Sequence, residues 1–355
     1  MTARTDIGGG PKSVLMLSKY LPEEFDIYIA CPTDLPYYDL YLQTKRVKDF
    51  YPIPHRKFTL GKYVGLIRFV WKNNIQLINS NGTGAGFYVR LLKLFCWKPK
   101  VIHTFRGVNT KHIGSIKNRV YFLYEKLFSY LTDRFINVSY GEQNLCVSMG
   151  ILRKEQSVVI HNGLEGLKKN VAFNENQLAG KFVITTLSRF DYPKNMFDSY
   201  KIASALKEYT DIVFLWIGDG EDKEKLEQLS KENNVNIYFA GFRTNVADYL
   251  SVTDLYLSTS IWEGLPLALL EASSMGIPMV ASDIIGNNEV VKNDVNGFLF
   301  KPGDIDEAVR IIVKLYNDKN LYYKLSEASK NIFLENFSVE IMTSNTARLF
   351  RNMLN

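Results

Sequence analysis

Short apolar runs alternate with longer amphipathic stretches along the whole chain of 355 residues. The runs are rich in β-branched and aromatic residues, a composition that predicts buried strands. They lie at 25–31, 75–80, 99–105, 134–139 and 157–162 in the first half, and at 181–188, 212–218, 235–241, 254–260 and 277–282 in the second. Helical patterns separate them, for example at 117–131 and 195–209. Strands that alternate with helices predict an α/β protein with doubly wound parallel sheets.

Two successive sets of strands predict two Rossmann-like domains that face each other across a cleft. The polar segment 162–180, which is rich in Gly and Asn, is the expected linker between them. A length of 355 residues also favours two domains. In open α/β sheets, ligands bind at the carboxyl ends of the strands, so functional residues are expected directly after strands.

Composition narrows the class of protein. With 46% hydrophobic and 23% charged residues, the chain is typical of globular proteins. Its apolar runs are much shorter than the roughly 20 residues of a membrane helix, and the first residues lack the apolar core of a signal peptide. The 3 cysteines and 4 histidines have no metal-ligand spacing. We therefore expect a cytoplasmic protein with free thiols and without a metal site.

Charge is distributed unevenly. Residues 1–165 hold 23 Lys and Arg against 12 Asp and Glu, and residues 166–355 hold 20 against 25. The segment 50–124 has 13 basic residues and no acidic one. Such a face attracts anionic lipid headgroups, polyanions or phosphorylated substrates, although a solvated surface is the alternative. Within it, 90–100 mixes basic and large apolar residues, as in a helix end on a membrane surface or in a core-facing helix with outward lysines.

Two loops at strand ends carry residues suited to anions. Gly8, Gly9 and Gly10 precede Pro11, which suits the first position of a helix, and a glycine turn into a helix makes a backbone-amide anion site. The pair Gly-Pro also marks ordinary turns. Arg189 and Lys194 follow the strand at 181–188, and together they could bind a diphosphate. An ordinary surface loop is the alternative there.

Two carboxylates interrupt the otherwise apolar stretch 258–282. Pro266 is the expected first residue of a buried helix over 266–275 that ends at Gly276, so Glu263 precedes the helix and Glu271 lies in its second turn. Buried carboxylates are costly unless something pairs with them. Free amides flanked by two carboxylates suit a ligand that is anionic in the middle and carries hydroxyls at both ends, such as a nucleotide sugar. The alternative is an N-terminal charge and a buried cap.

The segment "SIWEGLPLALLEASSMGIPMVASDIIGNNEVV" resembles the signature of retaining glycosyltransferases of family 4, which have the GT-B fold. Its mark is E-x7-E, here Glu263 and Glu271, followed by "GIPMVAS" and "NGFLF". The pieces "IGGG", "NGL", "LSRFDYPKN", "IGDGE" and "AGFR" also occur in the order of the family. The resemblance covers nearly the whole chain. It implies an acceptor-side domain at 1–165, a nucleotide-sugar-binding domain at 166–337, and a helix at 338–355 that packs back on the first domain.

The resemblance also implies a role for each matching residue. Glu263 would bond the donor sugar's hydroxyls, and Glu271 those of the ribose. The remaining positions are Gly264, Leu265 and Pro266 near the sugar and phosphate, Arg189 and Lys194 on the diphosphate, Phe242 and Arg243 near the base, and Gly8, Gly9 and Gly10 near the donor phosphates. The family needs no metal or other cofactor, because cations and helix dipoles take the charge of the leaving group.

Two positions depart from the family. Gly8 lies only seven residues after Met1, so the strand expected before the glycine loop is truncated or begins upstream. The segment "HTFRGVN" places Arg106 where the family commonly has an active-site histidine. Arginine cannot act as a base, but it can bond a sugar hydroxyl or an acceptor phosphate. His103 falls within a strand, which favours a core position over a catalytic one.

The resemblance therefore predicts a retaining hexosyltransferase. The expected donor is a UDP-sugar in preference to a GDP-sugar, and the expected acceptor is a lipid-linked glycan of bacterial surface polysaccharide. The basic first domain adds an anionic membrane surface as a partner, so the enzyme would be cytoplasmic or peripheral on the inner membrane face. No nucleic acid partner is expected. Two alternatives are a GT-B nucleotide-sugar epimerase or hydrolase, and an inactive nucleotide-sugar-binding protein.

Overall fold

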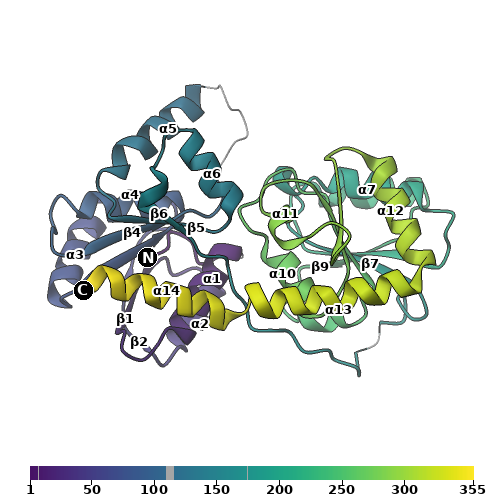
Figure 1. Ribbon diagram of the computed structural model, residues 1–355, viewed down its shortest axis with the longest axis horizontal. Helices are drawn as coiled ribbons and strands as arrows, with labels where there is room; N and C mark the ends of the chain where they lie inside the picture. Colours follow the sequence, from purple (N-terminus) through teal and green to yellow (C-terminus); the bar gives the residue numbers. More distant parts are fainter. Residues whose placement is uncertain (7, 109–115, 174) are drawn as a thin grey trace. The chain divides into compact units, whose positions relative to one another are not determined.

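The computed structural model describes residues 1–6, 8–108, 116–173 and 175–355 (Figure 1). The chain forms two compact units, Met1–Glu165 with Phe337–Asn355, and Gly166–Asn336. The sequence predicts Phe337 in the second domain, but Phe337 belongs to the first unit. Its ring lies 5.3 Å from that of His161, and its carbonyl accepts a hydrogen bond from the Leu164 amide at 3.1 Å.

The first unit has two parallel sheets. A two-stranded sheet pairs β1 (Ile27–Cys31) with β2 (Val47–Pro52), and a four-stranded sheet has the order β3 (Leu77–Asn81), β4 (Lys100–Thr104), β5 (Arg134–Asn137) and β6 (Ser157–Val159). Thr2 connects the two sheets. It forms a parallel bridge with Asn81, and its amide donates to the carbonyl of Ala30 at 3.1 Å. The strand expected before the glycine loop is therefore a single bridge between β1 and β3.

Helices cover these sheets. They are α1 (Gly9–Tyr20), α2 (Tyr37–Leu42), α3 (Leu60–Lys72), α4 (Gly82–Leu92), α5 (Ile116–Ser129), α6 (Tyr140–Ser148) and α14 (Val339–Leu354). The last helix of the chain packs on α1 in this unit, and the rings of Phe350 and Phe25 meet edge to face at 5.8 Å. The ends of the chain thus share one hydrophobic core, which is why the C-terminal helix belongs to the N-terminal unit.

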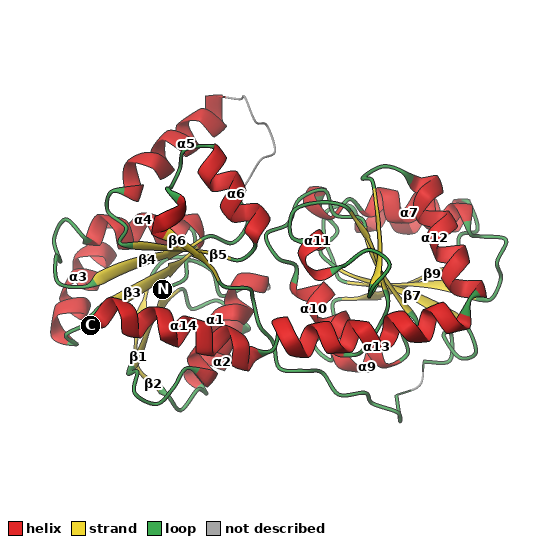
Figure 2. Cartoon of the chain, in the orientation of Figure 1, coloured by secondary structure: helices red, strands yellow, loops and turns green. Residues whose placement is uncertain are grey.

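The second unit has one parallel sheet of six strands (Figure 2). Their order is β12 (Gly297–Phe300), β11 (Met279–Ser282), β10 (Leu255–Ser258), β7 (Phe182–Leu187), β8 (Ile212–Ile217) and β9 (Ile237–Gly241). The helices are α7 (Met196–Ala205), α8 (Lys223–Glu232), α9 (Val246–Ser251), α10 (Leu267–Ser274), α11 (Asn287–Val290), α12 (Ile305–Asn317) and α13 (Lys319–Asn336). Central strands are buried on both faces, and Trp216 and Phe214 of β8 are among the largest buried side chains.

The buried helix α10 begins one residue later than expected. Pro266 has an extended ψ of 119°, so it is the N-cap and Leu267 is the first helical residue. Its missing N–H costs nothing at this position, where the amide would have no partner within the helix. Gly276 follows the helix with a positive φ of 71°, which confirms it as the end of the helix. Glu271 keeps the position predicted for it, in the second turn.

Candidate functional site

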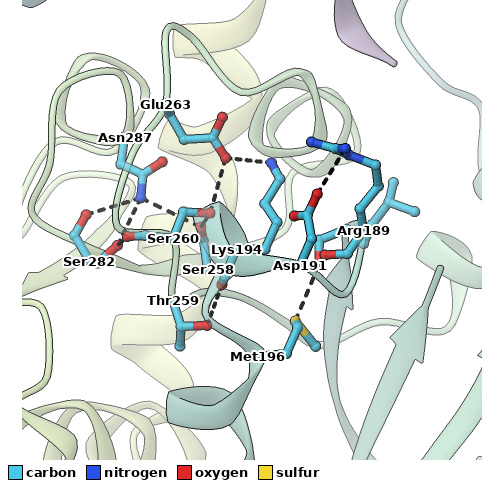
Figure 3. Close-up of polar contacts among 12 residues, drawn as sticks. Arg189, Asp191, Lys194, Met196, Ser258, Thr259, Ser260, Glu263, Ser282 and Asn287 are labelled. Atoms are coloured by element: carbon cyan, nitrogen blue, oxygen red, sulfur yellow. Dashed lines mark hydrogen bonds and ion pairs between the residues drawn. The ribbon is translucent and has the colours of Figure 1, made fainter. Parts of the chain in front are cut away.

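A lysine and a glutamate meet at the carboxyl ends of two neighbouring strands (Figure 3). Lys194 lies in the loop after β7, and Glu263 lies in the loop between β10 and α10. Because β7 and β10 are adjacent and parallel, these residues approach each other although 69 positions separate them. Lys194 Nζ lies 2.5 Å from Glu263 Oε1, and the side chains are only 20% and 14% exposed. The pair is thus largely shielded from water, which strengthens the attraction between the charges.

The Glu263 loop is held by a network of hydroxyls and one amide. Ser260 Oγ donates to the same carboxylate oxygen as Lys194, at 3.0 Å. Ser282 Oγ donates to the carbonyl of Ser260, and Asn287 Nδ2 donates to Ser282 Oγ at 3.1 Å. Figure 3 shows this series of contacts running from Asn287 to the carboxylate. Ser260, Ser282 and Asn287 were not predicted, because hydroxyls and amides at such spacing occur in any loop.

The two loops are also joined through their backbones. Thr259 Oγ1 donates to the carbonyls of Lys194 at 3.1 Å and of Asn195 at 3.0 Å. The amide of Ile261 donates to the carbonyl of Pro193 at 2.9 Å. Asn195 itself has a left-handed backbone with φ of 48°, which Asn tolerates better than most residues. These bonds fix the backbone beneath the Lys194–Glu263 pair.

Arg189 lies on the same loop in a different environment. Its Nη1 pairs with Asp191 Oδ2 at 2.8 Å, and its side chain is 51% exposed. The loop packs against Gly218 and Gly220, where an added Cβ would lie 1.8 Å from the carbonyl oxygen of Ser188 and 2.4 Å from that of Phe190. Only glycine permits that approach. The arginine therefore projects from a rigid loop toward solvent, and its partner Asp191 was not predicted.

Glu271 lies at the same end of the sheet as Glu263. It is 5% exposed in α10. Burial raises the pKa of Tyr256, and the charges of Glu271 and Glu263 raise it further. Gly264, Leu265 and Pro266 connect the two glutamates and are buried. The structure thus places Glu263 in the loop before α10 and Glu271 in the second turn of that helix, as predicted.

Phe242 and Arg243 lie farther along the same edge of the sheet. They follow β9, which is separated from β7 by β8. The Phe242 ring is exposed. Arg243 Nε donates to the hydroxyl of Tyr249 at 2.7 Å, and the guanidinium lies over the Tyr249 ring at 5.8 Å from its centroid. An exposed ring beside an oriented arginine makes a surface on which a planar group can stack.

In the first unit, the predicted glycines open a helix. Gly8 is the N-cap of α1, and Gly9 and Gly10 are its first residues. Pro11 is therefore the third helical residue rather than the first, and its missing N–H is still tolerated in the first turn. An added Cβ on Gly10 would meet nothing within 4 Å. The helix N-terminus is thus unobstructed at Gly10, although the protein's own packing does not require glycine there.

Arg106 lies where three strands of the first unit end. Its Nη2 donates to Asn81 Oδ1 at 2.6 Å, and its Nη1 donates to Ser13 Oγ at 3.0 Å and to Asn162 Oδ1. Asn81 ends β3, Arg106 follows β4, and Asn162 follows β6. Burial lowers the pKa of Arg106 to about 10, while the nearby Glu142 carboxylate opposes that shift. The guanidinium therefore stays protonated near neutral pH, and the acceptors that bind it are uncharged.

His103 is a core residue, as its place in a strand predicted. It is fully buried, and its Nδ1 lies 2.9 Å from Ser80 Oγ. Burial and the neighbouring charge of Arg90 lower its pKa well below the usual value. The imidazole is thus neutral and held within the β3–β4 region.

Groups of metal ligands and membrane-spanning helices are both absent from the part of the chain that the structure describes. No group of three or more His, Cys, Asp or Glu among these residues is placed to hold a metal ion. None of the helices in the described ranges combines the length and apolarity needed to cross a bilayer.

Residues 168–332 match the family model described as "Glycosyl transferases group 1", and residues 7–165 match the one described as "Glycosyltransferase Family 4". The matching regions account for most of both units. The chain therefore belongs to the family 4 glycosyltransferases, and its two Rossmann-like domains have the GT-B fold.

The chain is similar in sequence to two curated glycosyltransferases and in fold to one solved structure. It is 29% identical over 338 residues to the UDP-Gal:alpha-D-GlcNAc-diphosphoundecaprenol alpha-1,3-galactosyltransferase of Escherichia coli, covering 89% of this chain and 86% of that one. The O-antigen biosynthesis glycosyltransferase WbnH of E. coli is 25% identical over 95% and 96% of the two chains. The crystal structure of Anabaena HepE with UDP-glucose is 19% identical, with a TM-score of 0.82 over 98% and 97% of the two chains.

Proposed function

We propose that this transferase moves a hexosyl group from a UDP-sugar to a lipid-linked glycan, with retention of anomeric configuration, in bacterial surface polysaccharide synthesis. The E. coli galactosyltransferase named above uses UDP-galactose and an acceptor on diphosphoundecaprenol, as its name states. HepE, with a similar fold, was crystallised with UDP-glucose. Both support a UDP-sugar donor, and the first supports the lipid-linked acceptor.

The observation that carries the proposal is the shielded Lys194–Glu263 pair beside the beginning of α10. A lysine ammonium has three donors, so it can keep its bond to Glu263 and still donate to a phosphate oxygen. Glu263 retains acceptor capacity for two sugar hydroxyls. Glu271 accepts bonds from the ribose, and Arg189 leaves Asp191 to bind the diphosphate as a planar fork. Phe242 and Arg243 contact the uracil.

The reaction then depends on positioning and on charge. The bond between the anomeric carbon and the diphosphate oxygen breaks, and a bond from the acceptor oxygen forms on the same face of the sugar. The acceptor proton passes to the departing phosphate. Lys194, Arg189 and the backbone amides of Gly264 and Leu265 stabilise the developing negative charge, without a metal or a cofactor. Cations fixed in a largely buried site need little reorganisation as the charge develops.

The first unit supplies the acceptor side in this proposal. Arg106 cannot accept a proton, so it binds an acceptor hydroxyl or the acceptor diphosphate. The Gly8, Gly9 and Gly10 amides approach the donor phosphates at the N-terminus of α1. Because the acceptor is anchored in a lipid, the enzyme works at the cytoplasmic face of an anionic membrane.

The test is a donor panel of UDP-galactose, UDP-glucose, UDP-N-acetylglucosamine and GDP-mannose with bacterial membrane lipid extract. We expect transfer from a UDP-hexose to the lipid fraction, unchanged by EDTA, with an α-linked product by NMR. Isomerisation or hydrolysis of the donor without an acceptor would instead favour an epimerase or hydrolase. Binding of UDP by calorimetry with no turnover on any pair would favour an inactive binding protein.

A further inference from the structure

Helix α5 of the first unit exposes an apolar face. Figure 1 draws this helix next to α4 at the edge of the unit. The residues of this face are strongly exposed, and we call them the α5 apolar face: Ile116, Val120, Leu123, Leu127 and, just after the helix, Tyr130. Their spacing of four, three, four and three positions places them on one side of a helix. Ile116 and Tyr130 at its two ends are 80% and 83% exposed.

The opposite side of the same helix carries a buried charge. Glu125 is fully buried and pairs with Arg90 of α4 at 2.7 Å, with both side chains inaccessible to water. The Arg90 guanidinium also lies over the rings of Tyr124 and Phe128. A helix on the surface of a soluble domain normally turns its aliphatic residues inward and its charges outward. In α5 the aliphatic side chains face outward, and the buried ion pair fixes the helix in that orientation.

Aromatic contacts connect α5 to a second exposed apolar group. The ring of Phe128 lies 5.9 Å from Phe87, Phe87 lies 5.3 Å from Phe58, and Phe58 lies 5.4 Å from Tyr63. Tyr63 in turn lies 6.0 Å from Phe95. Phe95 belongs to the turn after α4, where Leu94 and Trp97 are exposed as well. Packed rings therefore run from α5 to the segment 94–97.

The positive charge around the α5 apolar face and the segment 94–97 indicates which partner covers them. The segment 50–124 contains 13 Lys and Arg and no Asp or Glu. Exposed basic side chains accompany the apolar ones, including Arg119 and Lys126 on α5 and Lys98 beside Trp97. A second copy of the chain placed on this face by a two-fold axis would bring like charges together. An anionic bilayer offers acyl chains to the apolar residues and headgroup charge to the cations.

We infer that the α5 apolar face and the 94–97 segment form the surface by which this chain binds an anionic lipid bilayer, with the α5 side chains entering the headgroup region. The inference deepens the proposed function, because it names the surface that meets the membrane holding the lipid-linked acceptor. Binding combines buried apolar area with charge attraction, so it depends both on the aliphatic side chains and on salt.

The test measures partitioning of the full chain onto vesicles in a flotation assay. Vesicles of phosphatidylcholine with 30% phosphatidylglycerol are compared with pure phosphatidylcholine, at low and at high salt. We expect retention on the anionic vesicles, and a decrease of about tenfold or more when salt rises from 50 to 500 mM, since several charges contribute. A chain that the anionic vesicles do not retain at low salt would overturn the inference.

A matched pair of variants locates the surface. Leu127→Ser removes an aliphatic side chain that is 57% exposed on α5, and Leu334→Ser makes the same change at a 55% exposed site on α13. We expect a loss of about fivefold or more in the partition coefficient for Leu127→Ser, and more for Leu123→Ser with Leu127→Ser, against no change for Leu334→Ser. Equal retention of all variants would overturn the assignment to α5. Thermal unfolding and UDP binding check that each variant is folded.

Sedimentation of the chain without vesicles tests the alternative that a second copy of the chain covers the α5 apolar face. A concentration-dependent dimer that Leu123→Ser with Leu127→Ser abolishes would assign the face to a second copy and overturn the inference. The vesicle assay contains no donor and no acceptor, so its result is independent of catalysis. Vesicle binding without transfer would support the membrane-binding surface and refute the proposed function. Transfer without vesicle binding would support the proposed function and refute the membrane-binding surface.

Discussion

The two units place a cation at the carboxyl ends of their parallel strands, but they hold it differently. In the first unit, Arg106 is bound by the uncharged oxygens of Asn81, Ser13 and Asn162. In the second, Lys194 is paired with the carboxylate of Glu263 at 2.5 Å. The Glu142 carboxylate lies near Arg106, but the oxygens bonded to the guanidinium are uncharged, so an anionic ligand does not have to displace a carboxylate from it. A cation beside a carboxylate offers both a donor and an acceptor, which suits the mixed phosphate and hydroxyl chemistry of a nucleotide sugar.

Lys194 has the largest expected effect. We expect Lys194→Ala to lower kcat/KM for transfer by about 100- to 1000-fold, because it removes a preorganised donor to the leaving group and leaves Glu263 without its cation. Lys201→Ala is the control, since Lys201 is another ion-paired lysine of this unit but is 60% exposed on α7. Steady-state kinetics with the preferred UDP-sugar measure both. Loss of less than about tenfold in Lys194→Ala would limit the pair to a structural role.

Arg106 gives the corresponding test in the first unit. We expect Arg106→Ala to lower kcat/KM for the acceptor by about 10- to 100-fold, the range for one hydrogen bond to a charged group. The affinity for UDP, measured by calorimetry, should stay within about twofold, because Arg106 is not among the groups proposed to bind the donor. Arg106→Lys keeps the charge without the planar fork and should lose less. A parallel fall in UDP affinity would contradict an acceptor role.

Glu271 of the second unit has the smallest expected effect. Glu271→Ala should weaken UDP binding by about tenfold, the equivalent of roughly 1.4 kcal/mol. Binding of 2′-deoxy-UDP separates the ribose role from general damage. If Glu271 binds the 2′-hydroxyl, the variant should distinguish UDP from 2′-deoxy-UDP less well than the native chain does. Unchanged UDP affinity in the variant would refute the ribose role.

The sequence predicted most of the strands because their burial follows from their composition. Every residue of β8 is buried, and its run of Ile, Val, Phe, Leu and Trp predicts a buried strand. The strand β2 was not predicted, because its six residues are exposed or only partly buried and include Lys48, Asp49 and Pro52. Its place is set by pairing with β1, and that pairing depends on the register between distant segments.

The helix over 116–129 shows what a sequence pattern can and cannot predict. A helical period at 117–131 was evident, but period alone does not say which face turns inward. Arg90 and Glu125 decide this, and 35 positions separate them. A helical period of aliphatic residues ordinarily places those residues in the core, but in this helix it places them in solvent.

The sequence by itself determined the α/β class, the positions of most strands along the chain, and the spacing of Glu263 and Glu271 about the start of α10, because these follow from local composition and helical geometry. Only the tertiary structure decided which charges meet. Lys194 reaches Glu263 because β7 and β10 are neighbours in the sheet, and Arg106 reaches Asn162 because β4 and β6 end at the same edge. Sheet order is a long-range property, since each pairing is selected by the packing of the whole domain rather than by either strand alone.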